Sequence, residues 1–250
     1  MNRVALCIAY DGTLFSGYQV QPRKRTVQAE LERALAQIHK GQEISVIASG
    51  RTDTGVHARA QVVHFDSFLS IEASKWPKAL NSLLPADVRI SKAAIVRDDF
   101  HARFDAVIRQ YHYRVLARKE GDVFRRNMAY HFPYKIDMEA MQLAARHLIG
   151  TYDFSSFCSS KTDVVDKVRT LHDISITCEA DEIIFTITGN GFLHNMVRII
   201  IGTLLEIGTG KRTPEELVSI RDARDRTSAG KTAPGHGLYL LQVTYESPLF

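Results

Sequence analysis

A single carboxylate in residues 48–65, ASGRTDTGVHARAQVVHF, has a setting that suggests chemistry. Asp53 is surrounded by small, hydroxylated and basic residues: Gly50, Arg51, Thr52, Thr54, Gly55 and Arg59. An aspartate in such a turn commonly hydrogen-bonds to the backbone two residues on, so a structural role is one interpretation. However, a hairpin turn needs only the glycine and the aspartate. The nearby cations, Arg51 and Arg59, therefore need another explanation. Asp53 is therefore the best candidate for a catalytic acid.

A second candidate is Arg198, in the stretch FLHNMVRIIIGTLLEIG. At helical spacing, Asn195, Arg198, Gly202 and Glu206 form a narrow polar stripe on an otherwise apolar helix. Glu206 is two turns from Arg198, roughly 12 Å along the axis, and too far to pair with it. A buried guanidinium is costly without an anion. Either Arg198 reaches solvent past its neighbours, or it faces a carboxylate from the other half of the chain.

A third candidate is Tyr111 in IRQYHYRV. On an alternating strand, Tyr111 and Tyr113 share one face, and Gln110, His112 and Arg114 point to the other. We interpret Tyr113 as a packing residue. For Tyr111, packing competes with a role in which the ring stacks on an unpaired base.

The sequence contains none of the common metal or cofactor motifs. There is no H-E-x-x-H, no paired cysteine spacing, no zinc-deaminase signature, and no phosphate-binding glycine motif or G-x-S-x-G. Any catalysis is expected to use side chains without a metal or cofactor. Cys7, Cys158 and Cys178 are too widely spaced for a disulfide framework. With no apolar run long enough for a bilayer and no cleavable signal, we expect a reduced, cytoplasmic protein without membrane association.

The charge pattern favours a polyanionic partner. The net charge is +4 and the isoelectric point is about 8.9. Basic residues cluster between the periodic segments, at Arg23-Lys24-Arg25, Arg125-Arg126, Lys211-Arg212, and Arg221, Arg224, Arg226 and Lys231. One such cluster is typical of a solvated surface. Four of them favour nucleic acid.

The elements that must position these residues follow the same order in both halves. Periodicity predicts strands over residues 4–9, 44–49, 61–66 and 88–96 and helices over 26–40 and 73–84. The second half has strands over 109–117, 173–178, 183–188 and 237–245 and helices over 137–150 and 192–207. A capping box, Thr213-Pro214-Glu215-Glu216, begins a further helical segment. We predict an α+β fold of two similar subdomains, residues 1–105 and 106–250, each a mostly antiparallel sheet covered by helices, with a basic cleft between them.

Taken together, these segments resemble the TruA-type tRNA pseudouridine synthase family. The resemblance lies in YDGTLFSGYQVQ, GRTDTGVHARAQVVHF, ALNSLLPADV, FHARFDAVIRQYHYRV, DFSSF, GNGFLHNMVRIIIGTL and GLYLLQV, which span the chain in order. The departures are small: Thr54 replaces the usual Ala, Tyr18 a common Trp, and Gly235-His236 a frequent Pro-Pro.

The resemblance implies an isomerase that converts uridine to pseudouridine at tRNA positions 38, 39 and 40, without a cofactor and as a homodimer. It makes Asp53 the nucleophile, Tyr111 the base-stacking residue and Arg198 the ion-pair partner of Asp53. Arg51 and Leu238 would contact the target nucleotide. Further RNA contacts are expected from Arg23, Lys24, Arg25, His57, Arg59, Arg103 and Arg109.

Two other functions fit parts of the sequence. For a non-catalytic RNA-binding or RNA-folding protein, the basic loops alone would suffice, and such a protein gains nothing from burying an acid beside a guanidinium. A small-molecule glycosidase needs two carboxylates roughly 5–10 Å apart, and the stretch around Asp53 offers one.

Overall fold

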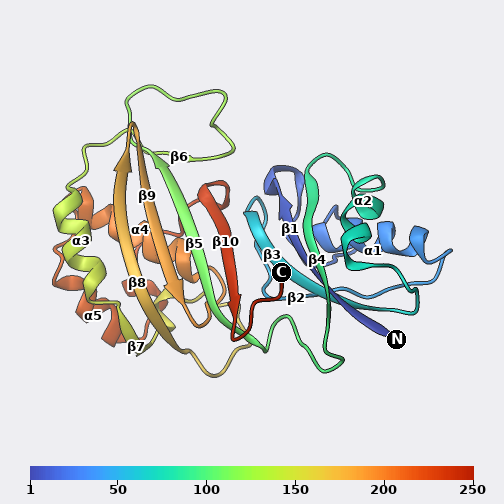
Figure 1. The fold of residues 1–250 in the computed structure, drawn as a ribbon. Helices are drawn as coiled ribbons and strands as arrows, with labels where there is room; N and C mark the ends of the chain where they lie inside the picture. Colours follow the sequence, from blue (N-terminus) through green and yellow to red (C-terminus); the bar gives the residue numbers. More distant parts are fainter. The chain divides into compact units, whose positions relative to one another are not determined.

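The computed structural model describes residues 1–250 and divides into two compact units (Figure 1). Unit 1 is Met1–Ile108 together with Tyr239–Phe250, and unit 2 is Arg109–Leu238. The sequence predicts that all of residues 106–250, including the last strand, belong to the second subdomain. In the structure, the last strand lies in unit 1 because Tyr239 and Leu240 pair in parallel with His57 and Ala58. None of the helices is long and apolar enough to span a membrane.

Unit 1 is built on a sheet in which β1 is central. β1 (Asn2–Tyr10) lies between β3 (His57–Ser67) and β4 (Val88–Val96) and is antiparallel to both. β2 (Ile47–Ala48) pairs antiparallel and β10 (Leu238–Tyr245) parallel with β3. The helices are α1 (Val27–Ile38) and α2 (Trp76–Asn81), with 3₁₀ turns η1 (Gly12–Leu14) and η2 (Ala73–Lys75). The fully buried Trp76 ring meets Phe65 of β3 edge-on, with centroids 5.2 Å apart, so α2 closes the core over the sheet.

Two predicted elements of unit 1 are shorter than expected. The strand over residues 44–49 is reduced to Ile47–Ala48, because the backbone N–H of Val46 donates to the Glu32 carboxylate (3.0 Å) instead of to a neighbouring strand. The helix over residues 73–84 begins as a 3₁₀ turn and is α-helical only over Trp76–Asn81. Pro77 explains the break, because it has no N–H for an α-helical bond to residue 73. The predicted start of α1 is confirmed, since the Thr26 side chain accepts a bond from the N–H of Ala29.

Unit 2 combines mostly antiparallel strands with three helices. β9 (Glu182–Gly189) lies between β5 (Ala106–Leu116) and β8 (Val168–Glu179), and β8 also pairs with β7 (Gly150–Asp153), all antiparallel. β6 (Tyr130–His131) pairs parallel with β5. The helices are α3 (Met138–Arg146), α4 (Met196–Gly208) and α5 (Glu216–Ala223), with 3₁₀ turns η3 (Ser155–Phe157), η4 (Arg226–Ser228) and η5 (Gly235–Gly237). The α+β class of mostly antiparallel sheets and helices is as predicted.

The differences in unit 2 have local causes. β6 and β7 were not predicted, because strands of two and four residues are too short to show an alternating pattern. The helix expected from residue 192 begins at Met196, because Asn195 has a left-handed backbone with φ of 62°. The expected capping box before α5 is present in part, since the Thr213 N–H donates to the Glu216 carboxylate (2.6 Å).

Candidate active site

The candidate acid lies in unit 1, on a loop that is held in place from both sides. Residues 50–56, the Asp53 loop, lead directly into β3, and the N–H of Val56 donates to the carbonyl of Asp53 (3.1 Å). Thr52 is anchored twice, because its carbonyl accepts from the N–H of Tyr18 (3.0 Å) and its hydroxyl bonds to that of Tyr10 (2.8 Å). Asp53 itself is half-buried. Its backbone is therefore fixed while its side chain stays partly accessible.

Two glycines of the YDGTLFSGYQ segment allow this close packing. A Cβ at Gly12 would lie 2.1 Å from the Val56 carbonyl oxygen. Gly17 has φ of 88°, and a Cβ there would lie 2.9 Å from the carbonyl oxygen of Thr52. Only glycine fits where two backbones approach this closely or where φ is positive. The motif around residues 11–18 thus serves to clamp the Asp53 loop, a role that the sequence reasoning missed. Two glycines spaced around a strand end were the available signal.

His57, expected as an RNA contact, supports the loop from inside unit 1. It is 2% exposed, and its Nδ1 accepts the N–H of Gly12 (3.0 Å). Its ring stacks on Tyr239 of β10, with centroids 4.6 Å apart and planes 21° apart. The cations in this stretch, Arg51 and Arg59, are exposed, and the Arg59 guanidinium lies 6.0 Å from the Tyr239 ring centroid. These two arginines, and not the imidazole, are at the surface.

Arg198 lies on the first turn of α4 in unit 2 and is held by a defined set of acceptors. Its Nε donates to the carbonyl of Ala233 (2.7 Å), and its Nη1 donates to Oδ1 of Asn195 (2.8 Å). The N–H of Ala233 in turn donates to the carbonyl of Arg198 (3.0 Å). Arg198 is half-buried. The side chain is therefore oriented by unit 2 itself.

The rest of the polar stripe on α4 packs against residues 229–233, the 229–233 segment. A Cβ at Gly202 would lie 1.7 Å from the carbonyl oxygen of Lys231, so the backbones touch there. The Glu206 carboxylate accepts the N–H of Lys231 (3.2 Å) and pairs with Arg212 (2.8 Å). As expected, Glu206 is engaged away from Arg198. Lys231 of the 229–233 segment, AGKTA, was assigned to a basic cluster, but the contact of this segment with α4 was not predicted, and its small residues were the signal for it.

The two tyrosines of β5 differ as expected in one respect. Tyr113 is fully buried and donates its hydroxyl to the carbonyl of Pro234 (2.8 Å), and this burial raises the pKa of Tyr113 far above its usual value. The predicted packing role of Tyr113 is confirmed. Tyr111 is 8% exposed, and its ring meets Phe192 edge-on, with centroids 5.0 Å apart. Leu238, at the start of β10, is buried.

The basic residues separate into structural and exposed ones. Arg25 forms a two-pronged pair with the Asp87 carboxylate (2.7 and 2.9 Å), also contacts Glu30, and lies over the Phe15 ring. Arg109 donates to the carbonyl of Asn190 (2.8 Å). The exposed ones among the predicted RNA contacts are Arg23, Lys24, Arg51, Arg59 and Arg103.

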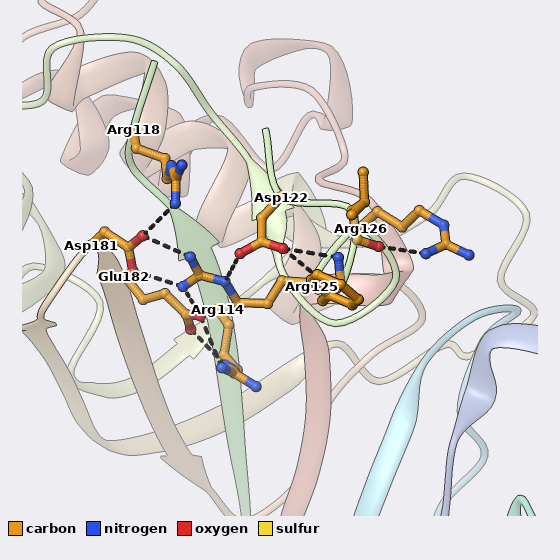
Figure 2. Close-up of polar contacts among 9 residues, drawn as sticks. Arg114, Arg118, Asp122, Arg125, Arg126, Asp181 and Glu182 are labelled. Carbon is orange, nitrogen blue, oxygen red and sulfur yellow. Dashed lines mark hydrogen bonds and ion pairs between the residues drawn. The ribbon is translucent and has the colours of Figure 1, made fainter. Parts of the chain in front are cut away.

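The pair Arg125-Arg126 separates in the same way (Figure 2). The Arg125 guanidinium donates to Asp122 (2.7 Å), Asp181 (2.7 Å) and Glu182 (2.9 Å), and it ties the loop between β5 and β6 to the turn between β8 and β9. Arg125 lowers the pKa of the Asp181 carboxyl far below its usual range. Arg126 is exposed. Arg125 is therefore a clamp within unit 2 rather than a surface cation.

Comparison with known proteins identifies the class of this protein. A family model described as tRNA pseudouridine synthase matches residues 6–105 and 144–246. The chain belongs to the tRNA pseudouridine synthase family and is an isomerase.

The relatives match over nearly their whole length and carry the name tRNA pseudouridine synthase A. A protein named tRNA pseudouridine synthase A from Halalkalibacterium halodurans is 62% identical over 238 residues, which cover 95% of this chain and 90% of that protein. Its counterpart in Bacillus subtilis is 57% identical, over 98% of this chain and 100% of that protein. Among solved structures, a chain of a Cbf5–Nop10–Gar1 complex is 13% identical with a TM-score of 0.33, over 80% of this chain and 54% of that one, which is too weak to support any argument. The resemblance seen in the sequence is confirmed.

Proposed function

We propose that this protein isomerises uridine to pseudouridine at positions 38, 39 and 40 of the tRNA anticodon stem-loop. Family membership and the names of the relatives support a tRNA substrate. The observation that carries the proposal is the Asp53 loop, in which glycines and anchored neighbours fix the backbone of one partly accessible aspartate. A loop that only had to turn would not need this clamping.

The reaction exchanges one bond for another within a single nucleotide. The bond from C1′ of the ribose to N1 of uracil breaks, the base rotates, and C1′ bonds to C5. The proton on C5 then leaves and N1 gains one, so no atom is gained or lost. Asp53 can form a covalent intermediate or stabilise the ribosyl cation and accept the C5 proton, and a fixed carboxylate serves either route.

Arg198 and Tyr111 complete the proposed site. Arg198 pairs with the Asp53 carboxylate and offsets the cost of holding that charge in a partly buried site. The fixed orientation of the guanidinium in unit 2 supports this role. Tyr111 stacks on the displaced uracil and offsets part of the cost of unstacking it, which is about a few kcal/mol. Arg51 and Leu238 contact the target nucleotide.

The exposed cations bind the phosphates of the tRNA. Exposure best supports this role for Arg23, Lys24, Arg59 and Arg103. Arg109 is a further phosphate contact, although its guanidinium also donates to the carbonyl of Asn190. Arg25 and His57 contribute through the loops that they support. Such contacts give an affinity that falls steeply with salt. The active form is a homodimer in the cytoplasm, with one tRNA contacting both subunits.

The test is to map pseudouridine in tRNA transcripts that keep uridine at only one of positions 38, 39 and 40. The purified protein should form pseudouridine in each transcript and none in a transcript lacking all three. Product at uridines outside this stretch only would contradict the site range. If the protein binds the transcripts but forms pseudouridine in none of them, it does not act as an enzyme on these positions. Light scattering should give twice the mass of one chain. A monomer with the full turnover rate would contradict the proposal that the active form is a homodimer.

A further inference from the structure

We propose that Asn195 is a positioning residue that orients the guanidinium of Arg198 for the reaction. This inference rests on the proposed role of Arg198 beside Asp53, and it adds a residue that acts on the site through Arg198 alone. Two observations on unit 2 carry it: the conformation of Asn195, and the way in which its side chain is used.

Asn195 has a backbone that few residues tolerate. It immediately precedes α4 with φ of 62° and ψ of 6°, in the left-handed region. Among residues other than glycine, asparagine is one of the few that adopt this region readily. The left-handed backbone therefore favours Gly, Asn or Asp at this position, and a glycine would satisfy the backbone alone. The presence of an amide side chain needs a further explanation.

The side chain of Asn195 is not used as a helix cap. An asparagine at this position usually accepts an N–H of the first helical turn through its side chain. Here the side chain makes no such bond, and its Oδ1 instead accepts Nη1 of Arg198 (2.8 Å). The amide is thus diverted from the helix to the guanidinium three residues later.

Together with Ala233, this contact fixes the plane of the guanidinium. The carbonyl of Ala233 accepts Nε (2.7 Å) and Asn195 accepts Nη1 (2.8 Å). Since the guanidinium is planar with its N–H groups in a rigid fork, two acceptors on different nitrogens also set the directions of the remaining N–H groups.

The acceptor at Ala233 is itself rigid. The N–H of Gly230 donates to the Thr203 hydroxyl (2.9 Å), Lys231 lies against Gly202, and Glu206 accepts the N–H of Lys231 (3.2 Å). Residues on two successive turns of α4 thus hold the 229–233 segment against the helix. Removing the Asn195 amide therefore takes away one acceptor of the guanidinium while this backbone stays in place.

The experiment uses Asn195→Gly in the 250-residue chain, because glycine keeps the left-handed backbone and removes only the amide. We expect kcat to fall about tenfold, with the Kd for tRNA and the melting temperature little changed. Asn81→Ala is the matched control. It removes an amide that bonds to the backbone N–H and C=O of Ile90 in unit 1 (2.8 and 2.9 Å), so it should lower stability and leave kcat intact.

A second readout follows the guanidinium directly, without any turnover. In protein labelled with ¹⁵N-arginine, the Arg198 signals are assigned by their loss in Arg198→Lys. Rotation about the Nε–Cζ bond should be slow in the wild type and markedly faster in Asn195→Gly. Unchanged kcat, or a fall in kcat with unchanged rotation, would overturn the positioning role. Because the rotation does not depend on the reaction, failure of the proposed activity would be seen separately.

Discussion

Replacing Gly17 by Ala should separate the placement of Asp53 from the stability of the fold. Gly17 has φ of 88°, and its Cβ would lie 2.9 Å from the carbonyl oxygen of Thr52, next to the candidate acid. An alanine in the left-handed region costs about 1–2 kcal/mol. Contact with a backbone oxygen cannot be relieved by turning a side chain, so we add about 1–3 kcal/mol for overpacking. The free energy of unfolding should fall by about 2–5 kcal/mol.

Gly41→Ala is a matched control in the same unit. Gly41 has a similar φ of 94°, and a Cβ there would meet nothing within 4 Å. This variant carries the backbone strain without the clash, so it should lose only about 1–2 kcal/mol. Its turnover of tRNA should match the wild type. Gly17→Ala should lose at least about tenfold in kcat, because a displacement of the Asp53 loop by a fraction of an ångström misplaces the acid.

Urea unfolding gives the two stabilities, and single-turnover assays at a temperature where both variants are folded give the rates. If Gly17→Ala loses stability as expected but turns over at the wild-type rate, the Asp53 loop does not need this clamp. Equal rates and equal stabilities of the two variants would refute the packing argument altogether.

Three further predictions concern pH, the base and the phosphates. Burial is the main cause that lowers the pKa of His64 from 6.5 to about 4, so the folded state resists the proton that the unfolded state takes up as pH falls below about 6.5. The free energy of unfolding should therefore decrease as the pH falls from about 6.5 to 4, by up to about 3 kcal/mol. His64→Asn keeps an acceptor, and urea unfolding of this variant at several pH values should not show this decrease. Tyr111→Phe should keep turnover and Tyr111→Ala should lose it, and equal kcat for the two variants would remove the stacking role. Lys24→Glu should weaken tRNA binding and reduce the magnitude of the slope of log K against log salt concentration by about one. Arg25→Glu should mainly lower stability, because it breaks the pair with Asp87. Filter binding and urea unfolding measure the two effects, and a stability loss in Lys24→Glu with a binding loss alone in Arg25→Glu would contradict this assignment.

Much of the fold follows from local patterns in the sequence. α1 begins where Thr26 caps it, and β4 spans the predicted residues 88–96, because alternation and capping are local signals. Pairing between distant segments leaves no such signal. The parallel pairing of Tyr239 with His57 brings the last strand into unit 1. This pairing depends on the path of the chain between distant segments, which local periodicity does not encode.

The candidate site was predictable in part for the same reason. Asp53 and Arg198 were conspicuous because a carboxylate among cations and a guanidinium on an apolar helix both break local rules. The residues that hold them were not: the role of Gly17 depends on its approach to Thr52, and that of the 229–233 segment on its contact with α4. Nor does composition distinguish a cation engaged by acids, such as Arg125, from an exposed one such as Arg126.

The most direct measurement compares Asp53→Asn with Asp173→Asn in a single-turnover assay on tRNA, with the Kd measured alongside. Asp173 is an exposed carboxylate on β8 and controls for the loss of one negative charge. We predict that Asp53→Asn binds tRNA about as tightly as the wild type and forms no pseudouridine, while Asp173→Asn is fully active. Pseudouridine formed by a clean Asp53→Asn preparation, free of deamidated protein, would contradict the assignment of Asp53 as the catalytic acid.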